Sequence, residues 1–162
     1  MVNIMELDEL IYKAEKWAIG LRQDFHRWPE LGNEEYHTSE RVLSELSSLG
    51  IETERLLPTG ILGTIRKRPE KRTVALRADL DALPVQEVVN LPFTSERKGI
   101  MHACGHDVHT AVLLGTAMVL SEIQDEINCN VKFIFQPAEE TTGGAKRMIR
   151  KGCLEPKTDY IL

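Results

Sequence analysis

The sequence predicts an α/β fold in which helices pack on a mixed β-sheet. Segments with the apolar spacing of a helix alternate with short segments typical of strands, and this alternation favours helices layered on a sheet. Residues 107–124 are rich in Ala, Val and Leu and apolar nearly all round, which indicates a buried helix. Residues 130–136 alternate large apolar side chains with other residues, which is typical of a strand.

The N-terminal part of the chain is predicted to form two helices. Apolar residues recur at helical spacing over residues 7–21, and this helix should end before Pro29, because proline disfavours helical conformation in the preceding residue. A loop follows over residues 29–33. The second helix covers residues 35–49 and ends at Gly50, since glycine accepts the left-handed conformation that closes many helices.

Strands are expected next. Residues 51–55 are the first candidate. Residues 60–66 and 72–77 are predicted to form a pair, joined by a polar turn that contains Pro69. The basic run at residues 66–68 is interpreted as part of this solvated turn rather than as a binding patch.

The remaining elements are a loop, a helix, a strand, a short helix and the start of a further strand. They cover residues 84–99, 107–124, 130–136, 144–151 and 160–162. Pro137 ends the strand that precedes it, and Gly152 closes the short helix. No internal repeat or low-complexity linker interrupts this order.

The composition excludes several classes of protein. The 162 residues are 42% hydrophobic and 28% charged, as in globular domains, and the net charge of -5 disfavours nucleic-acid binding, which needs clustered Lys and Arg. No segment resembles a signal peptide or reaches the roughly 18 apolar residues that span a bilayer. Three irregularly spaced cysteines suggest a reducing compartment. We therefore expect a cytoplasmic protein without nucleic-acid or membrane partners.

Three pairs of polar residues occur where a predicted helix or strand meets a loop. The pairs are Asp79 and Asp81, Cys104 and His106, and Glu139 and Glu140. The first and third pairs follow strands, and the second precedes the buried helix. Because ligands bind outside the carboxyl ends of strands in α/β sheets, the three pairs could converge.

Cys104 and His106 carry the thiolate and imidazole groups that bind Zn²⁺-like metals. Gly105 between them permits a tight turn that aims both side chains at one point, and the helix N-terminus favours a thiolate. The alternative is a buried free cysteine beside histidines that are satisfied by other partners. His102 and His109 flank this turn and are candidates for substrate contact.

Glu139 and Glu140 would repel each other if both were buried and charged, and a nearby cation would relieve that repulsion. A natural division makes one a metal ligand and the other a general base toward a water that the metal activates. The alternative is an exposed acidic loop.

Asp79 and Asp81 alternate along an extended segment, so they face the same side. Asp81 could hold the outer nitrogen of a metal-ligating histidine. The alternative is that both aspartates only form a turn at the strand end. His26 and His37 lie near helix ends and are expected to be surface or capping residues.

Four motifs together resemble the metal-dependent aminoacylase and carboxypeptidase family. The motifs are Phe25 to Gly32, Arg77 to Pro84, Met101 to His109 and Phe135 to Glu140, in that order along the chain. The similarity covers essentially the whole chain. It is greatest to the branch of N-acyl-L-amino acid amidohydrolases, hippurate hydrolases and indole-acetyl-amino acid hydrolases.

The resemblance implies a two-metal site that hydrolyses the amide bond of N-acyl amino acids or short peptides, with Zn²⁺ or Mn²⁺ as the metals. It implies Cys104, His106 and Glu140 as metal ligands. It also implies Glu139 as the general base that activates the water and protonates the leaving amine, and Asp81 as the carboxylate that orients the metal centre. No substrate-binding residue is assigned.

The resemblance further implies a longer protein, because family members carry an inserted lid and dimerisation domain followed by the rest of the catalytic domain. Residues 1–162 are then the N-terminal part of the catalytic domain, without those two parts and without two further His ligands. We expect the isolated chain to be inactive and the full-length protein to form a homodimer or a larger oligomer.

Two other hypotheses remain. The chain could be a non-catalytic folded remnant that binds metal weakly or acts as an interaction fragment. A structural metal site with Cys104 and His106 in a closed shell is less favourable, because no second Cys or His pair has zinc-finger spacing.

Overall fold

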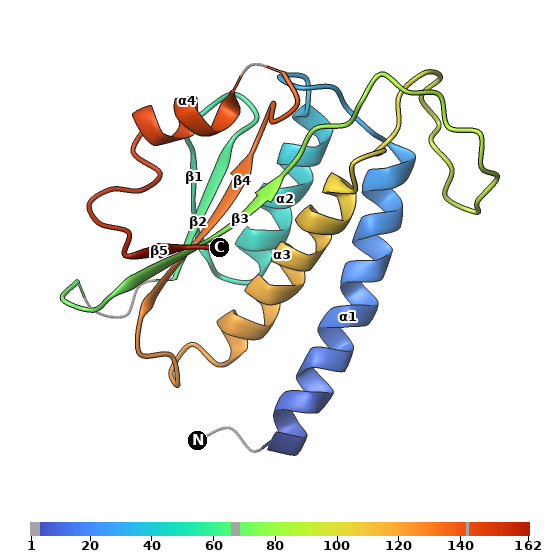
Figure 1. Cartoon of the computed structure of the whole chain (residues 1–162). Helices are drawn as coiled ribbons and strands as arrows, with labels where there is room; N and C mark the ends of the chain where they lie inside the picture. Colours follow the sequence, from blue (N-terminus) through green and yellow to red (C-terminus); the bar gives the residue numbers. More distant parts are fainter. Residues whose placement is uncertain (1–3, 66–68, 142) are drawn as a thin grey trace.

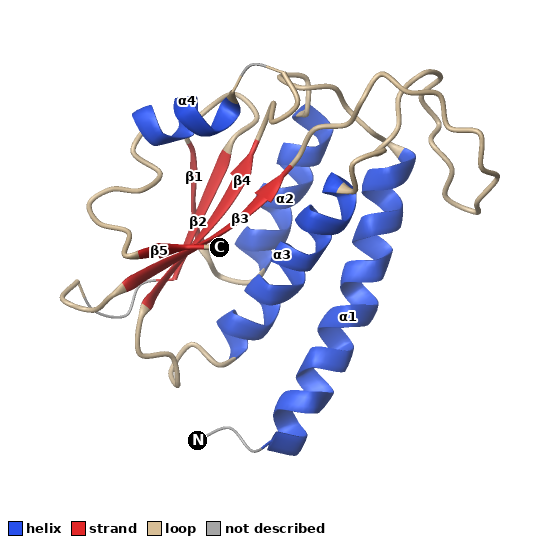
Figure 2. Cartoon of the chain, viewed as in Figure 1, coloured by secondary structure: helices blue, strands red, loops and turns tan. Residues whose placement is uncertain are grey.

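Helices cover both faces of a five-stranded sheet in the computed structural model, which describes residues 4–65, 69–141 and 143–162 (Figure 1). The helices are α1 (Ile4–Arg27), α2 (Tyr36–Ser48), α3 (His106–Glu122) and α4 (Gly144–Arg150). Helices α2 and α3 lie on one face with α1 packed along α3, and α4 lies over the other face (Figure 2). The predicted α/β class is confirmed.

The sheet is mixed, as predicted. Its strands are β1 (Glu52–Arg55), β2 (Ile61–Ile65), β3 (Thr73–Asp79), β4 (Asn130–Gln136) and β5 (Tyr160–Ile161), in the spatial order β1-β2-β4-β3-β5. Strand β2 is antiparallel to β1 and β4, whereas β3 is parallel to β4 and β5. Strands β3 and β4 therefore end at the same edge, where Asp79 is the register partner of Gln136.

The predicted pairing of residues 60–66 with residues 72–77 is wrong. Strand β4 lies between β2 and β3 and pairs with both of them. The physical reason is burial: every residue of β4 is buried, so this strand stabilises the sheet most when covered on both faces and both edges. Residues 66–68, interpreted as the solvated turn, lie outside the described residues.

Local signals placed the helix ends well. Helix α1 stops at Arg27, two residues before Pro29, and Gly50 follows α2 with a left-handed φ of 69°. Gly152 closes α4 in the same way with φ 88°. These ends match the predictions because proline and glycine act within one turn of the chain.

The alternation in β4 divides the core between the two faces of the sheet. Phe133 and Phe135 are fully buried against α1, α2 and α3, whereas Ile134 packs with Met148 of α4 and Cys153 on the opposite face. The first face is apolar, whereas the second also carries the buried polar side chains of Lys132 and Gln136, which form hydrogen bonds with Cys153 O and Arg77.

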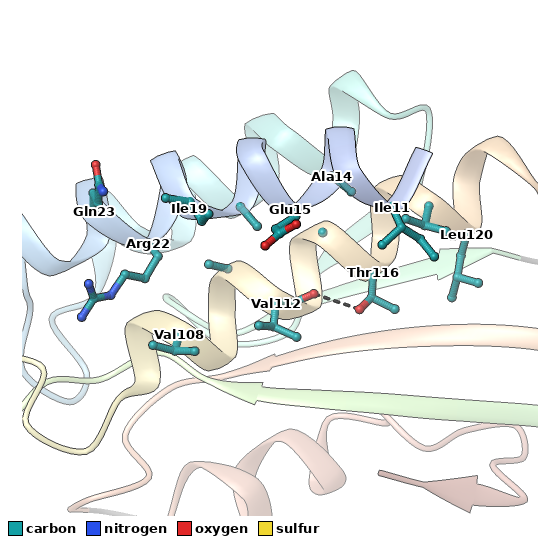
Figure 3. A pocket seen from close by; sticks show the side chains of 14 residues that line it. Ile11, Ala14, Glu15, Ile19, Arg22, Gln23, Val108, Val112, Thr116 and Leu120 are labelled. Carbon is teal, nitrogen blue, oxygen red and sulfur yellow. Dashed lines mark hydrogen bonds between the residues drawn. The ribbon is translucent and has the colours of Figure 1, made fainter. Parts of the chain in front are cut away.

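Helix α3 is less enclosed than its composition predicts. Leu113 and Leu114 are buried, but Val108 and Val112 are 42% and 58% exposed. They line an apolar groove of about 680 Å³ between α1 and α3 (Figure 3). Among the described residues, no helix has the length and apolar composition needed to cross a membrane.

Truncation of Leu114 tests whether α3 anchors the core. Leu114 is fully buried, so Leu114→Ala should lower the free energy of unfolding by about 2–5 kcal/mol, measured by denaturant titration. Val112→Ala is the matched control on the same helix, and because Val112 is exposed its effect should stay within about 0.5 kcal/mol. Equal effects of the two substitutions would contradict this packing.

Candidate active site

The three predicted pairs of polar residues meet at the carboxyl ends of β3 and β4. Leu80 donates its backbone N–H to Gln136 O at 3.0 Å, which keeps the chain paired just past β3. Helix α3 begins beside these strand ends (Figure 1), and Thr110 Oγ1 donates to Asp79 O at 2.8 Å. Side chains that lie far apart in sequence are thereby brought to one edge of the sheet.

His106 is the centre of this cluster and is 5% exposed. Its Nδ1 lies 2.8 Å from Asp81 O, and because a carbonyl oxygen only accepts, Nδ1 is the donor. In the neutral ring, Nε2 then carries the lone pair and lies 3.9 Å from Asp79 Oδ2 and 3.9 Å from Glu140 Oε1. The hydrogen bond with Asp81 raises the pKa of His106 in the absence of a cation.

Asp81 connects the turn before α3 to the loop after β4. It is 1% exposed, its Oδ1 lies 3.4 Å from His106 Nδ1, and its Oδ2 accepts the backbone N–H of Glu140 at 2.9 Å. Burial acts to raise the pKa of Asp81, but hydrogen bonds from His106 and Glu140 outweigh it and the pKa is lowered. Asp81 is therefore held as an anion beside His106.

Glu139 and Glu140 open to solvent directly after the buried end of β4. With His106 they form a group whose potential ligand atoms all lie within 4.8 Å of one another. Cys104 is exposed, and its hydrogen bond with Glu140 raises the pKa of the thiol. A cation bound among these groups would favour the thiolate instead.

This donor set fits a divalent cation. Four carboxylates surround His106, namely those of Asp79, Asp81, Glu139 and Glu140. Arg77 forms an ion pair with Asp79, and the remaining negative charge is concentrated on the open side of the cluster. A thiol, an imidazole with a free Nε2 and carboxylates at this separation are the ligands that borderline divalent metals prefer.

A second group includes a residue to which the sequence assigned no ligand role. Asp79 and His109 join His106 in a set whose ligand atoms lie within 4.8 Å of one another. His109 Nδ1 is 3.7 Å from Asp79 Oδ2, and the rings of His106 and His109 stack at 5.5 Å. The three-residue spacing of these histidines on one helix face could have indicated this group.

The two histidines expected to contact substrate differ in exposure. The side chain of His109 is 54% exposed, whereas His102 is 5% exposed and neither ring nitrogen has a hydrogen-bond partner among the described residues. Burial lowers the pKa of His102 to about 4, so this ring is neutral at pH 7. Of the two, only His109 faces solvent.

His26 was expected at the surface or as a cap, and this prediction is wrong for it, whereas His37 is exposed. His26 is 4% exposed, with Nδ1 2.8 Å from Asp107 Oδ2 and Nε2 3.1 Å from Glu87 Oε1. Arg22 also donates to Asp107, at 2.8 Å. This contact joins α1 to the start of α3, and only the packing of the two helices reveals it.

The apolar groove between α1 and α3 is not part of this site. The groove between α1 and α3 is apolar, with a few polar side chains such as Glu15, Arg22 and Thr116 along it (Figure 3). None of the residues predicted to carry chemistry lines it. The candidate active site is therefore the open cluster at the strand ends.

Comparisons with known proteins show the family of this chain. Residues 75–162 match peptidase family M20/M25/M40. The chain is 46% identical over 162 residues to thermostable carboxypeptidase 1 of Saccharolobus solfataricus, covering 98% of this chain and 41% of that protein. It is 40% identical over 152 residues to an N-acyl-L-amino acid amidohydrolase of Geobacillus stearothermophilus, covering 93% and 41%.

A solved structure shares the fold. The YXEP protein of Bacillus subtilis, described as a dinuclear metal binding peptidase from the M20 family, aligns with a TM-score of 0.87 at 41% identity. The alignment covers 93% of this chain and 42% of that one. The chain thus spans about two fifths of the length of these relatives, and the matches confirm the resemblance inferred from the four motifs.

The buried contacts of Glu87 predict a pH-dependent stability. Burial acts to raise the pKa of Glu87, but hydrogen bonds from Ser95 N–H and His26 outweigh it, so the pKa is lowered. Ionised Glu87 therefore stabilises the fold above the ordinary glutamate pKa, and this contribution is lost as pH falls through the lowered pKa.

Glu87→Gln should lower the free energy of unfolding by about 1–3 kcal/mol at pH 7, measured by denaturant titration. The difference from the wild type should shrink in acid as Glu87 itself is protonated. Glu96→Gln, on an exposed residue of the same loop, is the control and should change little. A difference that stays constant with pH would refute this assignment.

Proposed function

The chain belongs to peptidase family M20/M25/M40, and on that basis we propose that it forms part of a metal-dependent amidohydrolase acting on N-acyl amino acids. The observation that carries this proposal is the free Nε2 of His106, held 3.9 Å from Glu140 beside Glu139 and Cys104. The substrate class is taken from the similar N-acyl-L-amino acid amidohydrolase. Short peptides are the related alternative, as the similar carboxypeptidase suggests.

We propose Cys104, His106 and Glu140 as metal ligands, with Asp81 as the residue that orients His106. Bound divalent cations supply Lewis acidity, which polarises the acyl carbonyl and makes water a better nucleophile. Glu139 takes a proton from the attacking water and returns it to the leaving amine as the carbon–nitrogen bond breaks. The products are a carboxylate and a free amino group.

We propose a centre of two divalent cations, either Zn²⁺ or Mn²⁺. The described residues supply the ligands on one side of this centre. The mixture of thiolate, imidazole and carboxylate suits these metals. The similar Bacillus subtilis protein is described as dinuclear, which supports the count but not the identity of the metals.

In a protein of the relatives' length, we propose residues 1–162 as the N-terminal part of the catalytic domain. An inserted lid and dimerisation domain and the rest of the catalytic domain would then complete the site and form a homodimer or a larger oligomer. Free thiols at Cys104, Cys129 and Cys153 favour a reducing compartment, and we propose the cytoplasm.

The 162-residue chain by itself should bind a divalent cation without hydrolysing N-acetyl-amino acids or hippurate. The proposed ligands of residues 1–162 lie on one side of the two-cation centre. A second cation would therefore lack a complete set of ligands in this chain alone. Calorimetry with Zn²⁺ or Mn²⁺ and an assay for released amino acid measure the two properties. Cys104→Ser and His106→Ala should weaken the binding, and clear turnover by the isolated chain would contradict the proposal.

Substitution of Glu139 separates the base from the ligands. In a protein of the relatives' full length that carries residues 1–162, Glu139→Gln should lower kcat by about 10²–10⁴-fold, because the water loses its proton acceptor. Metal content, measured by elemental analysis, should stay near that of the wild type. Glu140→Gln is the matched comparison and should lower metal content. Retained activity in Glu139→Gln would refute the base assignment.

A further inference from the structure

Glu35 is a fully buried carboxylate that the proposed chemistry does not use. Its Oε1 accepts the backbone N–H of Ala138 at 2.7 Å, and its Oε2 accepts the Thr59 hydroxyl at 2.7 Å. Burial raises the pKa of Glu35, although these hydrogen bonds oppose the effect. Burying a carboxylate among neutral donors is costly, so its contacts call for an explanation.

Capping of helix α2 does not explain this burial. Glu35 occupies the N-terminal cap position of α2, but its side chain makes no capping hydrogen bond. Glu30 takes that part instead: it accepts the N–H groups of His37 and Thr38 at 3.1 and 2.9 Å, and the Thr38 hydroxyl at 2.9 Å. The Glu35 side chain is directed to the loop after β4 instead of to its own helix.

That loop has a strained backbone immediately before Glu139 and Glu140. Ala138 has a φ of 52°, a left-handed conformation that costs free energy for a residue with a Cβ. Its C=O accepts the N–H of Gly144 at 3.2 Å, and a Cβ on Gly144 would lie 1.6 Å from Pro137 O. Such a conformation persists only where surrounding contacts hold it.

The two hydrogen bonds to this loop lie on either side of Glu139. Glu35 accepts a hydrogen bond from the N–H of Ala138, and Asp81 accepts one from the N–H of Glu140. Asp81 already belongs to the polar cluster around His106. Glu35 reaches the loop from the N-terminal cap of α2, and its other oxygen accepts a hydrogen bond from the Thr59 hydroxyl. The two contacts therefore hold the backbone on both sides of Glu139.

We propose that Glu35 is a positioning residue: it holds the turn at Ala138 and so places the carboxylates of Glu139 and Glu140 against His106. This role rests on the proposed function, because it acts through the same cluster. It also gives the N-terminal cap residue of α2 a defined task in metal binding.

The test uses Co²⁺ as the probe, bound to the 162-residue chain. Glu35→Ala should raise the Co²⁺ dissociation constant by about 10–100-fold, the usual effect of losing a group that orients a ligand. The visible absorption of bound Co²⁺ should change as well, because it reports ligand geometry. Glu35→Gln should retain both properties, since its amide oxygen can accept from Ala138 and its amide nitrogen can donate to Thr59.

Glu30→Ala is the matched control. It removes another buried carboxylate beside α2, so it should lower stability without changing the Co²⁺ spectrum. If Glu35→Ala does not fold, Glu35→Asp draws the carboxylate back from Ala138 and serves the same comparison. Wild-type affinity and spectrum in a folded Glu35→Ala or Glu35→Asp chain would overturn the positioning role, as would an equal spectral change in Glu30→Ala. Absence of Co²⁺ binding by the wild type would instead refute the proposed function.

Discussion

The parallel pairing of β3 with β4 is the constraint on which the rest of the structure depends. Their register places Asp79 opposite Gln136, so both strands deliver their following residues to one edge of the sheet. A parallel pair needs a crossover connection, and α3 provides it, with its first residue, His106, at that same edge. If β3 paired with β2 instead, the aspartates and the glutamates would be separated by a strand.

Negative charge is the main energetic cost of this convergence. Asp81 is buried as an anion, and it is offset by the backbone N–H of Glu140 and by His106. Asp79 is offset by Arg77. Glu140 has only the Cys104 thiol and His106 Nε2, at 3.9 Å, beside it among the contacts given above, and Glu139 and Glu140 both lie on the open side of the cluster. The clustered carboxylates destabilise the fold without a cation, and the same arrangement therefore favours binding of a divalent cation.

Sequence patterns predicted most elements because their signals are local. The strand at residues 130–136 matches β4 in full, and Pro29 and Gly50 mark the ends of the first two helices. The errors concern relations between distant segments. The predicted pairing of the second and third strands ignored a strand that arrives much later in the chain. The burial of His26 depends on the packing of α1 against α3.

The candidate site likewise has features that the sequence predicted and features that only the packed structure determined. The sequence by itself determined which chemical groups are available, namely a thiol, an imidazole and paired carboxylates, because each motif is contiguous and its family resemblance is read without coordinates. Only the tertiary structure decided that His106 turns Nε2 toward Asp79 and Glu140, that Asp79 and His109 join the cluster, and that Glu35 reaches Ala138 across 103 positions of the chain. Hydrogen bonds between distant residues depend on the packed geometry of several elements, and no local pattern encodes that geometry.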